Sequence, residues 1–312
     1  MVHLRVVAPP DLAERALELL CRTPQVTNVV HLPGVAHKPE GDLILCDVAR
    51  EEASVVIGDL KDLDIPRHGS IAVELIDSSI SAVAEAAERA APGLPSDAVV
   101  WEEVEARTSE QTELSFTFVA FMVAAMLIAA VGIILDQPIL IVGAMVVGPE
   151  FGPLAAVCVA LVRRQPGLAR RSVLALAVGF PVGTAATLVA TLALIAAGVF
   201  PDEYGTHEFT DFISEPDFLS FFVAVVAGAA GMLSLTSAKS GALVGVLVSV
   251  TTIPAASNVG VATAYGDWHA AGGAAAQLGI NLTGIVLSGM LTLYVQNNEF
   301  RARRRRHLAD QN

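Results

Sequence analysis

A carboxylate between two prolines is the pattern in this sequence with the clearest chemical meaning. Glu150 lies between Pro149 and Pro153, and a glycine precedes each proline, inside an otherwise apolar stretch at residues 139–162. A proline within a helix removes a backbone donor and clashes with the carbonyl four residues earlier, so this stretch is predicted to be broken or strongly kinked. The stretch is long enough to cross a bilayer. Irregular backbone at membrane depth survives only where protein or a wet cavity satisfies it, so Glu150 is predicted to lie at an internal polar site.

A second apolar stretch, at residues 240–264, has a similar interruption. Its run Ser249-Val250-Thr251-Thr252-Ile253-Pro254-Ala255-Ala256-Ser257-Asn258 combines a proline with hydroxyl and amide side chains. A charge at membrane depth costs about 2.5–3.5 kcal/mol on insertion scales and is functional by default, so we expect a binding site at the two interruptions. The residues predicted to form it are Gly148, Pro149, Glu150, Gly152, Pro153, Thr251, Thr252, Pro254, Ser257, Asn258 and Asn281.

Plainer interpretations of these residues stay open. Glu150 could be hydrated near a membrane surface, or could cap the N-terminus of a half-helix, where the helix dipole favours negative charge. The hydroxyl and amide groups, Asn281 among them, could be hydrogen-bonding contacts between helices, which small polar residues commonly supply in membranes. Gly241 and Gly245 have the spacing of a close helix–helix contact.

The composition is that of a membrane protein with an acidic N-terminal domain. Hydrophobic residues make up 54% of the 312 residues, and the mean hydropathy is +0.60. Residues 1–114 contain 9 Lys/Arg and 21 Asp/Glu, whereas residues 115–312 contain 10 and 11, so the N-terminal third carries almost all of the net charge of −13. Because nucleic-acid binding needs a basic surface, this charge argues against a nucleic-acid partner.

The inventory of reactive side chains argues against catalysis. The histidines are scattered, no His/Cys/Asp cluster has the spacing of a metal site, and no serine of the apolar stretches has a paired histidine. The three cysteines are interpreted as small, reduced core residues. We therefore expect no catalytic residue, no metal and no cofactor, and we expect that the chain is not an enzyme.

Residues 1–76 are predicted to form a small α+β domain. Strands are expected at residues 3–8, 26–31, 43–48 and 71–76, and helices at about 11–20 and 51–63. The order β-α-β-β-α-β is that of a ferredoxin-like sandwich. Residues 77–114 are expected to be a helical connector, in which Glu102, Glu103 and Glu105 form a solvated face.

Residues 115–299 are predicted to form a helical membrane domain of six spans. We place them at about 115–135, 138–162, 172–199, 217–236, 240–264 and 272–296. The positive charges after Arg107 all fall on one side of this arrangement: Arg163, Arg164, Arg170, Arg171, Lys239 and those of the tail at residues 300–312. By the positive-inside rule that side is cytoplasmic, and so are both termini. This topology suffices to explain the basic tail, which could also bind anionic lipid.

The six spans divide at residues 201–217 into two sets of three, and the middle span of each set is the interrupted one. Because three is odd, the second set enters the membrane from the opposite face, which predicts a 3+3 inverted repeat with broken second and fifth spans. Interrupted segments in corresponding halves point to a transporter-like site. The expected function is therefore a small-solute or ion transporter or channel, which the N-terminal domain could regulate.

The alternative is a membrane-anchored sensor of a nucleotide or an amino acid that has no transport activity. The paired interruptions favour transport, because an anchor needs no broken helices. The expected partners are the bilayer, an unidentified small-molecule ligand and further copies of the chain. Gly/Ala-rich spans and a sheet with edges able to pair predict a homo-oligomer, a dimer or a trimer.

Several motifs of the membrane domain resemble a known family. These are Gly143-Ala144-Met145, Gly148-Pro149-Glu150-Phe151-Gly152-Pro153-Leu154, Thr236-Ser237-Ala238-Lys239-Ser240-Gly241-Ala242-Leu243-Val244-Gly245-Val246 and Gln277-Leu278-Gly279-Ile280-Asn281-Leu282. In this order they resemble the membrane proteins grouped as domain of unknown function 389, the uncharacterised hydrophobic domain family. The resemblance covers about residues 115–296. It implies a multi-pass protein of a bacterial inner membrane with a cytoplasmic ferredoxin-like extension, and it implies no substrate or reaction.

Overall fold

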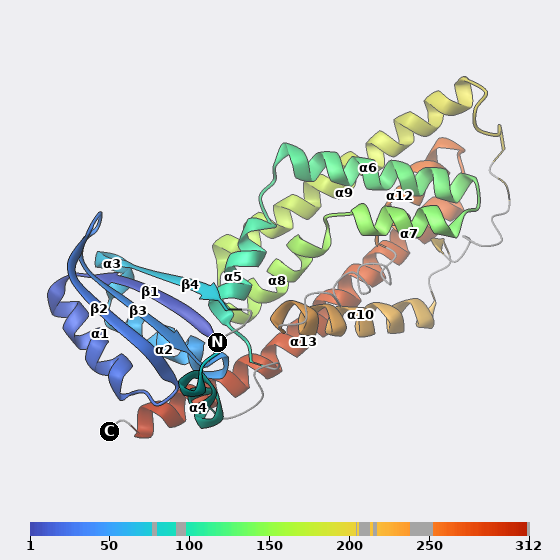
Figure 1. The fold of residues 1–312 in the computed structure, drawn as a ribbon. Coiled ribbons are helices and arrows are strands. Elements are labelled where there is room, and N and C mark those ends of the chain that lie inside the picture. Colours follow the sequence, from blue (N-terminus) through green and yellow to red (C-terminus); the bar gives the residue numbers. More distant parts are fainter. Residues whose placement is uncertain are drawn as a thin grey trace. The chain divides into compact units, whose positions relative to one another are not determined.

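The computed structural model describes residues 1–76, 80–91, 98–203, 205, 213–214, 217–237 and 252–310 (Figure 1). The chain divides into two compact units. The first unit comprises Met1–Val104, Thr236–Ala238 and Glu299–Asn312, and the second comprises Glu105–Leu235 and Lys239–Asn298. The segment predicted as a connector therefore contributes to both units, and the basic tail is part of the first.

A four-stranded antiparallel sheet forms the centre of the first unit. Its strands are β1 (Val2–Ala8), β2 (Val26–His37), β3 (Glu40–Val48) and β4 (Ser70–Leu75), in the order β2-β3-β1-β4. Helix α1 (Pro10–Arg22) follows β1, and α2 (Arg50–Asp62) follows β3, with a short α3 (Ile65–His68) before β4. The predicted order of strands and main helices is confirmed.

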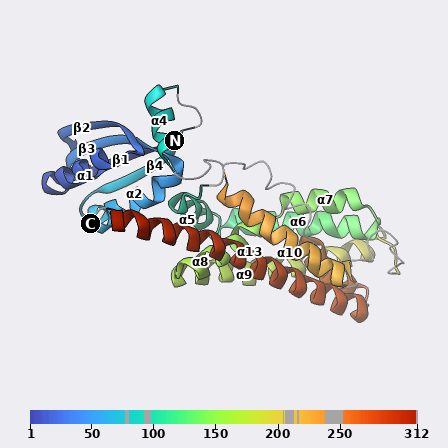
Figure 2. The same cartoon turned by 90° about the horizontal axis from the view of Figure 1, so that it is seen from below.

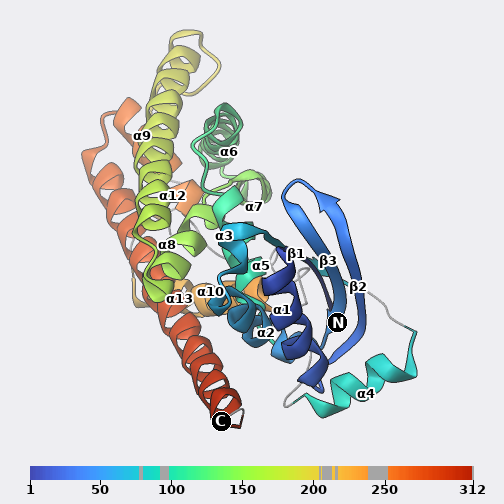
Figure 3. The ribbon, with the colours of Figure 1, turned by 90° about the vertical axis from the view of Figure 1, so that its left-hand side faces the viewer.

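The predicted second and third strands, at residues 26–31 and 43–48, are too short. β2 continues through Pro33 and Gly34, and the turn lies at Lys38 and Pro39, so that the β2–β3 hairpin extends past the other strands (Figure 3). β2 is an outer strand of the sheet. A proline is tolerated there because its missing N–H removes no bond of a central ladder.

Alternation along the strands places the core of this unit on one face of the sheet. Leu4 and Val6 of β1 and Ile44 of β3 are fully buried, and they share a cluster with Leu20 of α1 and Leu60 of α2. Figure 1 shows α1 and α2 on this same face. Two of the cysteines, Cys46 and Cys158, are buried as expected, whereas Cys21 is exposed.

The acidic residues of α5 (Trp101–Glu110) are not the predicted solvated face. Glu102 accepts hydrogen bonds from Ser54 Oγ (2.7 Å) and Lys61 Nζ (2.8 Å), and Glu103 pairs with Arg50 at 3.6 Å. Both carboxylates thus hold the first turns of α5 against α2. The prediction failed because helical spacing shows which residues share a face, but not which cations a neighbouring helix brings to them.

One arginine of the basic tail binds protein. Arg304 lies in α13 (Trp268–Asp310), and its Nη2 donates to Oδ2 of Asp62 at the end of α2 (2.6 Å). Its guanidinium also lies over Gly58, where an added Cβ would stand 3.2 Å from Cζ. A remaining helix of this unit, α4 (Ala82–Ala90), is capped by Ser81, whose hydroxyl accepts from the Ala84 amide.

The second unit contains the long apolar helices. Four are long and apolar enough to cross a membrane: α6 (Phe116–Ile134), α9 (Pro166–Ala196), α10 (Phe218–Thr236) and the Trp268–Ala302 part of α13. A bent pair, α7 (Pro138–Val147) and α8 (Phe151–Arg163), passes the same test together. The described residues therefore hold four candidate spans, or five if the bent pair is one span. Of the predicted fifth span the structure describes α12 (Thr252–Ala264), while Lys239, Gly241, Gly245 and Thr251 lie outside the described residues.

Side chains of this unit are sorted as in a membrane protein. Large apolar side chains stand exposed on the helix surfaces, for example Ile139 (81%) and Leu291 (65%), whereas Thr187 and Ser257 are fully buried. Water disfavours so much exposed apolar surface, and a bilayer does not. The helices pack closely where glycine allows it: α10 lies beside α13 (Figure 2), and Gly228 stands against the backbone of Ile285.

Candidate binding site at the helix break

The predicted interruption of the second span is a bend of 51° between α7 and α8. Gly148 is the C-cap of α7 and Glu150 is the N-cap of α8. Pro149 has no N–H to continue the helix, and its ring would clash with the carbonyl four residues earlier. Pro153 falls in the first turn of α8, where a helix needs no such donor. The prolines thus end one helix and permit the next to start.

Glu150 is buried at this bend and faces α12. Only 4% of the residue is exposed, and Thr252 Oγ1 donates a hydrogen bond of 2.8 Å to its Oε1. Thr252 is the first residue of α12 and is itself 1% exposed. The other oxygen of the carboxyl, Oε2, is buried and has no hydrogen-bond partner among the described residues. Glu150 thus lies inside the protein beside the first residue of α12, where the prediction placed it.

The two glycines of the predicted site permit close approaches. A Cβ on Gly148 would collide with Oε2 of Glu150 and would stand 2.7 Å from Cγ1 of Ile253 in α12. A Cβ on Gly152 would stand 2.7 Å from Cβ of Gln111. The missing side chains therefore let the carboxyl fold back over the end of α7 and let the segment after α5 lie against α8.

The polar residues further along α12 have other partners. Ser257 Oγ donates to the Met126 carbonyl of α6 (2.7 Å), and Asn258 Nδ2 donates to Ser214 Oγ (2.6 Å). These bonds connect segments of the unit, as the plainer interpretation of such side chains has it. Pro254 is buried in the first turn of α12, at the position that Pro153 occupies in α8.

Helix α13 brings two buried amides to this part of the unit. Asn281 was predicted as a site residue, and its Oδ1 accepts from Gln277 Nε2 one turn earlier (3.4 Å). Leu278, between them, packs in the clusters that contain Ala144 of α7 and Ala255 of α12. Gln277 is 1% exposed, and its Oε1 has no partner among the described residues. Gln277 could have been predicted from the sequence, because it places an amide one helical turn before Asn281 in an apolar helix.

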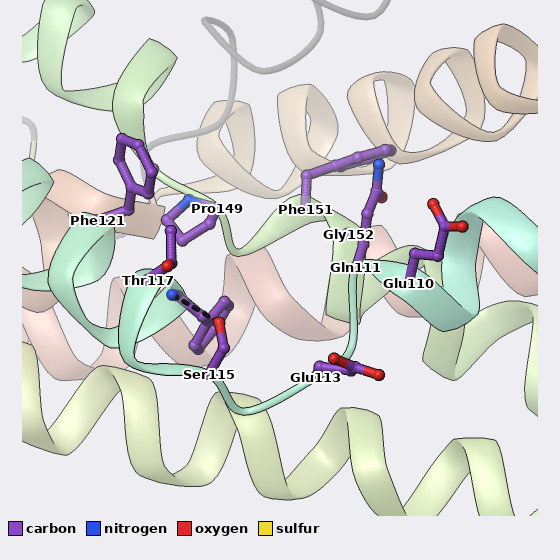
Figure 4. A pocket seen from close by; sticks show the side chains of 11 residues that line it. Glu110, Gln111, Glu113, Ser115, Thr117, Phe121, Pro149, Phe151 and Gly152 are labelled. Carbon is purple, nitrogen blue, oxygen red and sulfur yellow. Dashed lines mark hydrogen bonds between the residues drawn. The ribbon is translucent and has the colours of Figure 1, made fainter.

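A pocket of about 370 Å³ lies against the break. Its lining combines residues before and in the first turns of α6 with the turn between α7 and α8 (Figure 4): Glu110, Gln111, Glu113, Ser115, Thr117, Phe118, Phe121, Gly148, Pro149, Phe151 and Gly152. Ser115 also caps α6, since its Oγ accepts from the Phe118 amide (3.1 Å). Sequence reasoning missed the residues before Gly148, because their approach to the break is a tertiary contact.

Part of the chain matches a family model. Residues 145–287 match the model of a family described as domain of unknown function (DUF389), which confirms the resemblance predicted from the motifs. The chain matches no curated protein and no solved structure. The matched region includes the break, Glu150, Thr252 and both amides of α13, and it excludes the sheet of the first unit. The similarity to this family is therefore confined to residues 145–287, which lie almost entirely in the second unit.

Proposed function

We propose that the protein is a transporter or channel for a small solute or an ion, with its site at the break between α7 and α8. The observation that carries the proposal is Glu150, a buried carboxylate at a helix interruption, held through one oxygen by Thr252 of a second predicted interruption. A carboxylate in such a place is expensive and is functional by default. Its second oxygen has no hydrogen-bond partner among the described residues, so it can still bind a proton or accept a hydrogen bond from a ligand.

The proposed architecture is six spans in a 3+3 inverted repeat. The support is that α8 and α12 are half-length helices with a proline as third residue, each placed in the middle of three predicted spans. Half-helices that meet near the middle of a membrane form the sites of many transporters. We assign the first unit to the ferredoxin-like class on its strand order, and propose that it regulates transport by binding a small molecule.

A solute survey tests the proposal. Full-length protein in liposomes is challenged with gradients of protons, alkali cations, ammonium, chloride and amino acids, and solute entry is followed by dye fluorescence or light scattering. We expect at least one solute to cross faster than in liposomes without protein. If every solute crosses equally slowly in both, transport is excluded for this panel and the membrane-anchored sensor becomes the better proposal.

The proposed location is an inner membrane with both termini cytoplasmic. Chains cut after Glu203 or after Arg306 and fused to a reporter should show opposite sidedness, because three and six spans end on opposite faces. Alkaline phosphatase should be active only after Glu203, and a fluorescent protein should mature well only after Arg306. The same sidedness at both positions would rule out six spans and the inverted repeat with them.

We further propose that the chain forms a homo-oligomer, a dimer or a trimer. Support comes from the outer strand β2, on which Val30, Leu32 and Val35 are between 40% and 48% exposed. An exposed apolar outer strand readily pairs with another chain. Native mass spectrometry in a mild detergent should show a dimer or a trimer, and Val30→Lys should shift the population toward monomer. A wild-type spectrum that contains monomer alone would contradict this proposal.

A further inference from the structure

The pocket beside the break has an unusual balance of charge. Two of its lining side chains are carboxylates, Glu110 and Glu113, and none is basic. Both are exposed, and neither forms an ion pair with any residue that the structure describes. The acidic residues one to two turns earlier differ: Glu102, Glu103 and Glu105 are each paired with a cation of the protein. Among the glutamates at residues 102–113, those without an ion pair to a described residue are thus the two that line the pocket.

Three phenyl rings complete the lining. Phe118 and Phe151 are less than 9% exposed, while Phe121 is 49% exposed and lies on the Pro149 side of the pocket in Figure 4. The face of an aromatic ring attracts a cation electrostatically, and its apolar surface also binds the body of an organic ion. The hydroxyl of Thr117 and the amide of Gln111 add acceptors for N–H groups.

This combination selects for one chemical class. An anion would be repelled by both carboxylates, and a metal ion would have to lose its hydration water before it could contact the rings. A neutral molecule would leave the two charges unused. A ligand with an ammonium group on an apolar body can contact both the carboxylates and the rings. Because the volume of the pocket is near the lower limit for ligand sites, we expect this ligand to be small.

We propose that this pocket binds an organic ammonium cation, with its charge beside Glu110 and Glu113 and its apolar part on the phenyl rings. The binding does not require that the cation be transported, so this inference does not depend on the proposed function. The ammonium group could belong to a soluble amine or to an ethanolamine lipid, because the pocket lies at the first turn of the candidate span α6.

Ligands that share one skeleton test the proposal. Full-length protein in an uncharged maltoside detergent is titrated with phenethylammonium, 2-phenylethanol and phenylacetate, and binding is followed by saturation-transfer NMR. We expect saturable binding of phenethylammonium with a Kd on the order of 1 mM or tighter, as small ligands allow. Binding of the alcohol should be at least about threefold weaker, and phenylacetate should not bind.

Variants then locate the site. The double substitution Glu110→Gln/Glu113→Gln should weaken phenethylammonium binding by about threefold or more, the range of two exposed ion pairs. The control Glu14→Gln/Glu40→Gln removes two exposed charges from the first unit and should leave the Kd unchanged, which separates a specific site from the general acidity of the chain. Phe121→Leu keeps the charges and should weaken binding about twofold or more through the lost ring.

The possible outcomes separate cleanly. Displacement of the probe by phosphatidylethanolamine, but not by phosphatidylglycerol, supports the site and identifies the lipid headgroup as its source of ammonium. Binding that neither lipid displaces supports a soluble amine. Absence of saturable binding, or an equal Kd for wild type and Glu110→Gln/Glu113→Gln at equal melting temperature, overturns the proposal.

Discussion

Glu150→Gln should reduce flux of the transported solute by roughly tenfold or more while the protein keeps its fold. Glutamine has the shape of glutamate, and its Oε1 can still accept a hydrogen bond from Thr252 Oγ1. In the wild type this hydroxyl oxygen lies 2.8 Å from Oε1 of Glu150. What it lacks is the negative charge and the ability to exchange a proton. Hydrogen bonds to charged groups contribute about 1.5–3 kcal/mol, which corresponds to a tenfold change or more in a rate or an affinity.

Two further variants make this result interpretable. Thr252→Val removes the hydroxyl donor but keeps the carboxylate, so we expect a smaller loss of flux and a change in solute preference. Glu203→Gln neutralises an exposed carboxylate outside the break and should behave as wild type. Size-exclusion profiles and melting temperatures of all proteins should agree before flux is compared.

The pH dependence of flux distinguishes two roles of Glu150. If the carboxyl exchanges a proton during transport, Glu150→Gln flattens the pH profile as well as lowering the rate. If the carboxylate only binds a solute, the profile keeps its shape and KM rises. Wild-type flux in Glu150→Gln at every pH would remove Glu150 from the mechanism, and its burial would then be a structural feature of the bend.

The break and its carboxylate could be predicted because their causes are local. A proline without an N–H ends a helix in any context, so Pro149 sufficed to place the bend now seen between α7 and α8. The approach of Glu150 to Thr252 followed from one further hypothesis, the correspondence of two interrupted spans. The hydrogen bond between these two residues confirms the approach. The order of strands in the first unit was equally readable, since each strand showed its own alternation.

Contacts between distant segments were beyond local patterns. The carboxylates of α5 seemed a solvated face because their spacing resembles one, whereas Arg50 and Lys61 hold two of them. The pocket was missed for the same reason, since nothing around Glu113 signals that it lies near Pro149. Pairings of this kind depend on how helices pack, which their separate periodicities do not determine.

A second large effect is expected at Gly260, where α12 crosses α9. A Cβ at this position would stand 2.7 Å from the carbonyl oxygen of Thr184 and 3.1 Å from the Leu188 nitrogen, both backbone atoms of α9. Real Cβ contacts are almost never shorter than 3.0 Å, so Gly260→Ala must push the two helices apart. One turn earlier, Thr184 Oγ1 donates to the Ala256 carbonyl at 3.1 Å, and this bond would lengthen as well.

Overpacking of this kind typically costs about 1–3 kcal/mol, so Gly260→Ala should lower the apparent melting temperature of the detergent-solubilised protein by several degrees. Because α12 also carries Thr252, the displacement should disturb the Glu150 site and reduce flux together with stability. Gly143→Ala is the matched control, since an added Cβ on that exposed residue of α7 meets no atom within 4 Å. Alanine is the better helix former by up to about 1 kcal/mol, so the control should melt at the wild-type temperature or above it. Equal melting temperatures for Gly260→Ala and wild type, measured at one scan rate in one detergent, would show that α12 and α9 do not approach as closely as described.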